Sequence, residues 1–259
     1  MTGEGLAVKT ARRRRGTVQV PAIVLRRSDF RESSRIVTCA TREHGRLTGL
    51  AKGAHRPDSP FLGRIDFLNE IVATFSAERP GLRLLERAEL VRERRSLRQP
   101  RRFLAASHLA QLAEYAMPDD RAEPAAYDLL LGGLNLLERC PESAIGTVVL
   151  GLELRHLELL GALPDLHLCN DCGMALGDAA FRQLGSCGLA CGSCAGPGRT
   201  AVGSEVLALL RTLASTGGRG WPELAPPIAA RIAAPLPALW LTAATEQRPR
   251  LRALLFAQL

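Results

Sequence analysis

The apolar positions of this chain change their spacing near residue 95. Before that point, short stretches rich in Val, Ile, Leu, Thr and Phe alternate with turn or charged residues, which predicts a succession of β-strands. The predicted strands are residues 17–27, 33–41, 45–52, 65–77 and 82–90. Five strands over about 75 residues are typical of a small Greek-key barrel of the OB type.

After residue 100 the apolar positions recur with helical spacing. This spacing predicts helices at residues 103–115, 127–139, 143–160 and 204–214, and a proline-broken helical region from residue 228. The chain is therefore expected to be an α+β protein in three parts. These parts are a basic flexible arm at 1–16, an OB-type β-barrel at 17–95 and an α-helical domain at 96–259 that carries a cysteine-rich segment at 165–200.

The cysteine-rich segment contains two Cys-x-x-Cys pairs with 18 residues between them, formed by Cys169, Cys172, Cys191 and Cys194. This spacing is typical of a four-cysteine zinc site. Four thiolates fill a tetrahedral ion, so one zinc ion with a structural role is expected. Two disulfides or two redox motifs are the alternatives, and neither has support elsewhere in the sequence. Cys187 is a possible competing ligand, whereas Cys39 and Cys140 lie in apolar stretches and are expected in the core.

The net charge of +8 is concentrated in one part of the chain. Residues 1–64 contain fourteen Lys or Arg and five Asp or Glu, so the remaining residues are nearly neutral. Such a concentration of positive charge is typical of proteins that bind a polyanion, most often nucleic acid. The predicted DNA contacts lie at strand ends and turns: Arg35, Arg42, Arg46, Lys52, Arg56 and Arg64. Any one of them could instead form a weak surface ion pair, and Lys52 and Arg56 are the strongest candidates because they lie beside turns.

Aromatic residues are scarce in the predicted barrel. Phe30, Phe61, Phe67 and Phe75 precede residue 90, and the last two alternate with apolar residues as core positions do. We therefore expect DNA binding that depends mainly on phosphate contacts, tolerates any base sequence and weakens as salt is added.

Several other classes of protein are disfavoured. The sequence has no apolar run long enough to cross a membrane, and the apolar stretch 17–25 after Arg12–Arg15 lacks a cleavage site, so a cytoplasmic protein is expected. A zinc deaminase would need Pro directly before its Cys-x-x-Cys, where this chain has Leu168 and Ala190. His156 and Glu158 are expected on a helix surface or at its polar edge. No phosphate-binding glycine loop or nucleophile elbow is present, so the protein is not expected to be an enzyme.

Several local patterns resemble the RecO family of bacterial recombination mediators and DNA-annealing proteins. The resemblance lies in Ala22–Leu25 with Glu32 and Arg35–Val37, in Thr41–Leu47, in Ala51–Arg56, and in the step from Leu157–Gly161 through Pro164 to Cys169. It implies a protein of DNA repair and homologous recombination that binds single- and double-stranded DNA, anneals complementary strands and helps load recombinase on strands coated by single-stranded DNA-binding protein.

The same resemblance implies two protein partners. RecR would be expected mainly on the barrel. The C-terminal tail of single-stranded DNA-binding protein would bind a groove of the helical domain, to which Leu152, Leu154, Arg155 and Leu157 could contribute. The alternative is a zinc-ribbon transcription or assembly factor without annealing activity. In that protein the cysteine segment itself would bind a partner, although few cations accompany its cysteines.

Overall fold

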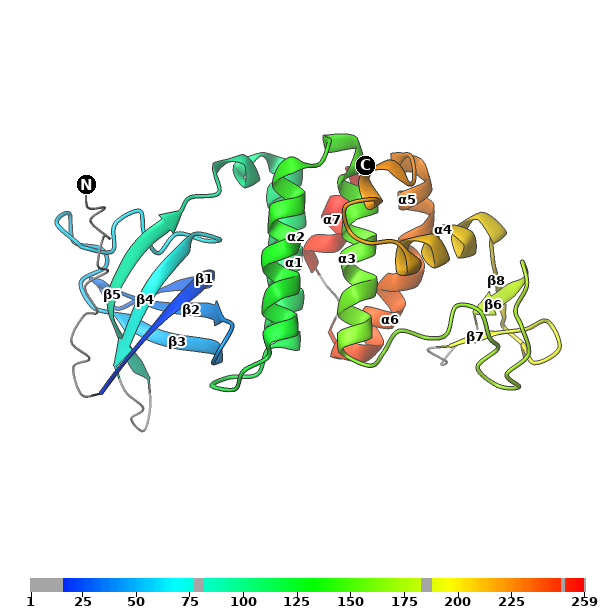
Figure 1. The fold of residues 1–259 in the computed structure, drawn as a ribbon, viewed down its shortest axis with the longest axis horizontal. Coiled ribbons are helices and arrows are strands. Elements are labelled where there is room, and N and C mark those ends of the chain that lie inside the picture. The colour runs from blue at the N-terminus through cyan, green and yellow to red at the C-terminus, as the bar shows by residue number, and fades with distance from the viewer. Residues whose placement is uncertain (1–15, 77–81, 183–187, 248–249, 259) are drawn as a thin grey trace, which may run out of the picture. The chain divides into compact units, whose positions relative to one another are not determined.

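A computed structural model describes residues 16–76, 82–182, 188–247 and 250–258 (Figure 1). The arginine run Arg12–Arg15 and the possible ligand Cys187 lie outside the described residues. The predicted order of a β-barrel followed by a helical region with a cysteine-rich insertion is confirmed.

Five strands close into a barrel in the order β1-β2-β3-β5-β4. Their bounds are β1 (Thr17–Phe30), β2 (Ser34–Thr41), β3 (Gly45–Ala51), β4 (Glu70–Ser76) and β5 (Arg83–Arg92). Buried residues alternate with partly exposed ones along β3 and most of β4, as expected when one face of each strand lines the barrel core. Neighbouring strands are antiparallel where β4 meets β1 and β5, and parallel where β3 meets β5.

The helical region is built around α3 (Ile145–Leu159), in which most residues are buried. Its neighbours are α1 (Pro100–Ala116), α2 (Pro124–Arg139), α4 (Ser204–Ser215), α5 (Pro227–Ala233), α6 (Pro235–Thr245) and α7 (Arg250–Ala257). Short 3-10 turns lie at η1 (Arg95–Arg98), η2 (Glu142–Ala144) and η3 (Trp221–Glu223). Proline occupies the first turn of α1, α2, α5 and α6, where a missing N–H costs no hydrogen bond.

Close packing around α3 depends on a glycine. A Cβ atom at Gly151 would lie 2.5 Å from the indole ring of Trp221, which is 3% exposed. The indole N–H of Trp221 donates to the carbonyls of Leu213 and Thr216, both at 3.0 Å. Gly151 therefore allows η3 to pack directly against the central helix.

A buried ionic cluster joins three helices of this region. The Glu153 carboxylate in α3 accepts hydrogen bonds from Arg252 Nε at 2.6 Å and Arg252 Nη2 at 2.8 Å. His108 Nε2 in α1 lies 2.7 Å from the same carboxylate, and all three residues are at most 6% exposed. Burial alone would raise the pKa of Glu153, but the charges and hydrogen bonds of Arg252 and His108 together outweigh it and hold the pKa below its usual value.

The cysteine-rich insertion after α3 contains a small antiparallel sheet. Its strands are β6 (Ala180–Arg182), β7 (Leu189–Ala190) and β8 (Thr200–Val202), in the order β7-β6-β8. We refer to residues 165–202 as the cysteine ribbon.

Contacts divide the chain into two compact units. The first contains residues up to Cys39 and residues Thr48–Arg92, and the second contains Ala40–Leu47 together with Glu93 onward. The turn between β2 and β3 thus belongs by its contacts to the helical unit. The functional division into an arm, a DNA-binding domain at 17–95 and a helical domain at 96–259 remains a proposal.

Within the described residues, no individual helix has the length and apolar character needed to cross a bilayer, and α5 and α6 reach them only when taken together, with a bend of 44° between them.

Candidate metal centre and nucleic-acid interface

The four paired cysteines meet in the cysteine ribbon. Ligand atoms of Cys169, Cys172, Cys191 and Cys194 all lie within 4.8 Å of one another. The sulfurs of Cys172 and Cys191 are 3.8 Å apart. A tetrahedral ion with metal–sulfur bonds of about 2.3 Å requires sulfurs about 3.8 Å apart, so the cluster has the dimensions of a four-thiolate metal site.

Backbone hydrogen bonds shape both cysteine turns. In the first turn, the amide of Cys169 donates to the carbonyl of Met174 at 2.8 Å, and in the second the amide of Ala195 donates to the carbonyl of Cys191 at 2.9 Å. The Cys191 amide also donates to the Cys169 sulfur at 3.3 Å and contributes most to lowering the pKa of Cys169 to about 6. This hydrogen bond therefore favours the thiolate form of Cys169, which is the form that binds a metal ion, whereas the neighbouring Cys172 sulfur raises the pKa of Cys194 to about 12.

The other described cysteines have a different role. Cys39 is fully buried and Cys140 is 4% exposed, which confirms them as core residues. Burial raises the pKa of Cys39 to about 12, so this thiol stays protonated at neutral pH.

The ribbon's Arg199 supports the second cysteine turn from outside the cluster. Its guanidinium donates to the carbonyls of Gly192 at 3.1 Å and Ala195 at 3.2 Å, and it lies 5.0 Å from the ring centroid of Phe181. Arg199 therefore holds the second cysteine turn against the ribbon sheet, which makes it a structural residue of the turn.

The six predicted DNA-contact residues fall into three kinds of surroundings. Arg35 Nε lies 3.0 Å from Asp29, Arg42 pairs with Asp128, and Arg46 Nε lies 3.0 Å from Asp119. Arg64 donates to the carbonyl of Ala88 at 3.1 Å and is exposed.

Lys52 and Arg56 are the exception. Both are exposed, and neither has an ion-pair partner among the residues that the structure describes. They lie in one turn after β3, where the amide of Arg56 donates to the carbonyl of Gly53 at 3.1 Å. Their ammonium and guanidinium groups are therefore available to a polyanion, whereas the charges of Arg35, Arg42 and Arg46 are already partly neutralised.

The aromatic residues of the barrel differ in how deeply they are buried. Phe75 is fully buried, as expected for a core position, and Phe61 is also buried at 4% exposure. Phe67 is only half-buried and so is not a full core residue. Phe30 is half-buried at the end of β1, and sequence reasoning gave it no role.

His156 lies deeper than the sequence suggested. We expected it on a helix surface or polar edge, but it is fully buried and its Nδ1 hydrogen-bonds the carbonyl of Leu152 at 2.9 Å. Most positions of α3 are buried on all sides, and His156 is among them. Glu158 does lie on the surface, 2.7 Å from Arg155.

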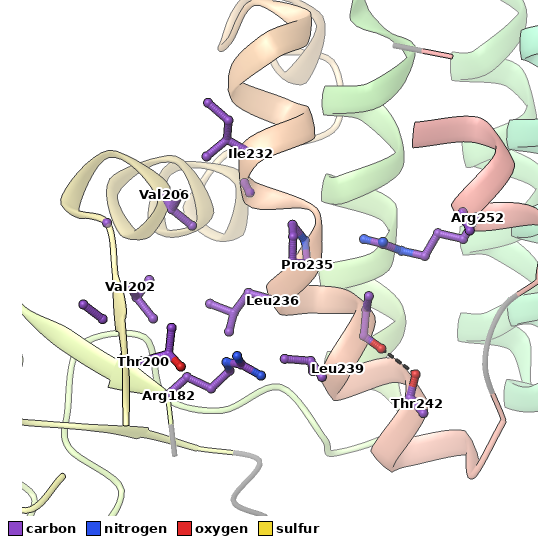
Figure 2. Close-up of a pocket in the computed structure, with 15 residues that line it drawn as sticks. Arg182, Thr200, Val202, Val206, Ile232, Pro235, Leu236, Leu239, Thr242 and Arg252 are labelled. Carbon is purple, nitrogen blue, oxygen red and sulfur yellow. Dashed lines mark hydrogen bonds between the residues drawn. The ribbon is translucent and has the colours of Figure 1, made fainter. Parts of the chain in front are cut away.

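Among the described residues, the helical unit contains a pair of sizeable cavities. The first, of about 700 Å³, lies between the cysteine ribbon and α4–α7, with mostly apolar walls. Arg182 reaches it from β6 and Arg252 from α7 (Figure 2). The second, of about 680 Å³, lies between α2, α3 and η3, and its walls include Leu136, Leu152 and Arg155. Arg139 and Arg219 are exposed at the second cavity, and Asp128 also lines it, with its charge balanced by Arg42.

Comparisons with known proteins cover both units. A family model described as "Recombination protein O N terminal" matches residues 14–94, and one described as "Recombination protein O C terminal" matches residues 97–227. The DNA repair protein RecO of Rhodopirellula baltica is 33% identical over 215 residues, covering 79% of this chain and 76% of that protein. The DNA repair protein RecO of Streptomyces griseus is 32% identical over 202 residues, covering 74% of this chain and 80% of that protein. The chain therefore belongs to the RecO family.

Proposed function

We propose that this protein is a mediator of DNA repair and homologous recombination. It binds single- and double-stranded DNA, anneals complementary strands, and helps load a recombinase on strands coated by single-stranded DNA-binding protein. The observation that carries the proposal is the match of RecO models to both the barrel and the helical unit. The proposal places the protein in the cytoplasm, associated with the nucleoid.

Two exposed cations of the barrel that have no ion-pair partner among the described residues give this proposal a physical basis. Lys52 and Arg56 supply positive charge in one turn, and Arg35, Arg42, Arg46 and Arg64 are the further proposed DNA contacts. Contacts to phosphates alone bring two like-charged strands together, because they neutralise charge without holding the bases. Bases that stay exposed are able to pair with a partner strand, as annealing requires.

We propose that the four-cysteine cluster holds one zinc ion. Thiolates in a tetrahedral set favour zinc, and four protein sulfurs leave no open position for water or substrate. The ion would link the two cysteine turns of the ribbon and stabilise its fold. No catalytic role is proposed for it, and we propose that the protein is not an enzyme.

The proposed partners are RecR and the C-terminal tail of single-stranded DNA-binding protein. An acidic and apolar tail would suit the second cavity, whose walls include Leu152 and Arg155 together with the exposed Arg139 and Arg219. Leu154 and Leu157 are fully buried and therefore contribute to the core and not to this groove. RecR is proposed to contact mainly the barrel.

An annealing assay tests the central proposal. Two complementary oligonucleotides coated with single-stranded DNA-binding protein are mixed, and duplex formation is followed with and without this protein across a salt series. We expect faster annealing without any nucleotide, and an effect that fades as salt rises. Folded, metal-loaded protein that gives no acceleration would favour the alternative, a zinc-ribbon transcription or assembly factor without annealing activity.

A further inference from the structure

The first hairpin of the barrel extends beyond the buried core. Residues Ala22–Leu25 of β1 are buried, whereas Arg26–Asp29 are exposed, and β2 becomes fully buried only from Val37. We call residues 26–36 the hairpin arm. Its sequence contains four arginines against one aspartate and one glutamate, so it is a cationic element. In OB folds, the loop between the first two strands is one of those that bind oligonucleotides.

An aromatic ring and a guanidinium meet at the tip of the hairpin arm. Phe30 ends β1 with its side chain half-buried, and the guanidinium carbon of the exposed Arg31 lies 5.3 Å from the centroid of the Phe30 ring. Arg31 has a φ of 55°, in the left-handed region that non-glycine residues seldom adopt. Strained backbone angles persist only where the surrounding structure holds them, and residues with such angles cluster at functional sites.

The hairpin arm is tied to the turn that carries the unpaired cations. The amide of His55 donates to the carbonyl of Ser33 at 3.1 Å, and His55 Nε2 lies 2.9 Å from the Asp29 carboxylate. Asp29 also accepts a hydrogen bond from Arg35 at 3.0 Å, which is the main cause of its lowered pKa. The arm and the turn are thus joined by a main-chain hydrogen bond and by a carboxylate whose charge Arg35 balances. Lys52 and Arg56 flank His55 in this same turn.

We propose that Phe30 and Arg31 form a base-stacking subsite for single-stranded DNA. One base stacks on the phenyl ring while Lys52 and Arg56 hold neighbouring phosphates. Proteins that bind single strands combine a cationic path for the backbone with aromatic rings that stack bases, and arginine adds a cation–π contribution. A subsite for one base anchors the strand and leaves the other bases open to a complementary strand. This inference rests on the proposed DNA-binding function.

The test separates stacking from charge by means of two oligonucleotides. One is a fluorescently labelled dT strand, and the other is an abasic strand of the same length and charge. Affinities are measured for the full chain and for the variants Phe30→Leu and Phe30→Tyr. We expect Phe30→Leu to weaken binding to the dT strand about tenfold and to leave binding to the abasic strand unchanged, because leucine keeps apolar volume without a π face. Phe30→Tyr should retain the affinity for the dT strand.

A second measurement reports stacking directly. Trp221 and Trp240 are each 3% exposed, so their emission should respond little to DNA. In Phe30→Trp the added indole should lose fluorescence when the dT strand binds and keep it when the abasic strand binds. Equal affinities of wild type and Phe30→Leu for the dT strand, or no quenching of the new tryptophan on binding, would overturn the stacking proposal.

The proposed function has a separate readout in the same experiment. If Lys52→Ala and Arg56→Ala weaken binding to both strands while Phe30→Leu changes neither, DNA binding stands and stacking fails. If wild-type protein binds neither strand at low salt, both proposals are overturned.

Discussion

Arg42 and Asp128 form a bidentate ion pair between the β2–β3 turn and α2. Arg42 Nε lies 3.0 Å from Oδ1 of Asp128, and Arg42 Nη2 lies 3.0 Å from its Oδ2. The pair raises the pKa of Arg42 and lowers that of Asp128, so both groups remain charged over the physiological range. A DNA phosphate would have to replace this carboxylate in order to bind Arg42, whereas no described carboxylate competes for Lys52 or Arg56.

This difference predicts unequal effects of charge removal on DNA binding. Lys52→Ala and Arg56→Ala should each weaken single-strand binding for every base sequence and lower the slope of log affinity against log salt by about 1. Arg42→Ala is the matched control and should change the slope less, since its charge is already balanced by Asp128. Titrations at several salt concentrations measure the slopes. A larger change for Arg42→Ala than for Lys52→Ala would reverse this ranking of the contacts.

The proposed zinc ion at the four-cysteine cluster predicts that loss of the ion destabilises the helical unit. Purified protein should contain one zinc ion per chain by elemental analysis, and Cys169→Ser should remove it. Because binding of the ion is coupled to folding of the ribbon, chelation or Cys169→Ser should lower the melting temperature.

The matched control for the metal centre is Cys39→Ser, in the barrel core, which should leave the zinc content unchanged. A Cys169→Ser protein that keeps its melting temperature but loses DNA binding would assign the ribbon to DNA contact instead.

The buried Glu153–Arg252 pair predicts strong coupling between α3 and α7. Arg252→Met would leave the carboxylate of Glu153 buried and only partly compensated, so we expect a loss of about 3–5 kcal/mol in the free energy of unfolding. The double variant Glu153→Leu/Arg252→Met removes both charges and should cost less than the sum of the single changes. Arg87→Met, which breaks an exposed pair with Glu89, should cost less than about 1 kcal/mol. Urea unfolding measures the free energy of unfolding of Arg252→Met, Glu153→Leu, the double variant and Arg87→Met. If the double variant costs as much as the two single changes added together, the two charges are uncoupled.

His156 predicts a loss of stability in mild acid. Burial lowers its pKa to about 4 from 6.5, so the unfolded chain takes up a proton at this position before the folded chain does. Stability should therefore fall as pH decreases from about 6.5 towards 4. His156→Gln removes this titration and should lose less stability than the wild type between pH 7.5 and pH 5. Urea unfolding at each pH measures the free energy of unfolding of both proteins. If both lose the same amount of stability as pH falls, His156 is excluded as the cause.

The sequence predicted the elements that depend on local pattern. Stretches rich in Val, Ile, Leu, Thr and Phe between turn residues identified all five barrel strands, and helical spacing identified the central helix, which begins at Ile145 after a short 3-10 turn. One strand was expected at residues 65–77, but β4 begins only at Glu70. Ile65 and Leu68 are buried as strand residues would be, yet the side chain of Asn69 donates to the carbonyls of Gly63 and Arg64 and closes a loop. The buried apolar residues of this loop therefore gave the same sequence signal as a strand.

In the candidate site too, features set by neighbouring residues could be predicted, and those set by residues far apart in the chain could not. The cysteine pairs could be identified because each pair lies within one turn, and their convergence follows from the spacing. The partners of Arg42 and Arg46 could not be predicted, since Asp128 and Asp119 lie far later in the chain and only tertiary folding brings them near. The burial of His156 was missed for the same reason, because helical periodicity alone does not say how many faces of α3 are covered.

The turn between β2 and β3 has a consequence for how such genes could be divided or recombined. The amide of Arg46 donates to the carbonyl of Pro118 at 2.9 Å, the amide of Asp120 donates to the carbonyl of Arg46 at 3.1 Å, and a side chain at Gly45 would collide with the carbonyl of Arg121. The turn is encoded in the first part of the gene, and its hydrogen-bond partners are encoded after residue 117. A break at residue 95 would therefore put the two partners of these main-chain hydrogen bonds on separate polypeptides. Exchange of barrels between relatives would succeed only where the incoming turn and the resident loop match in backbone shape.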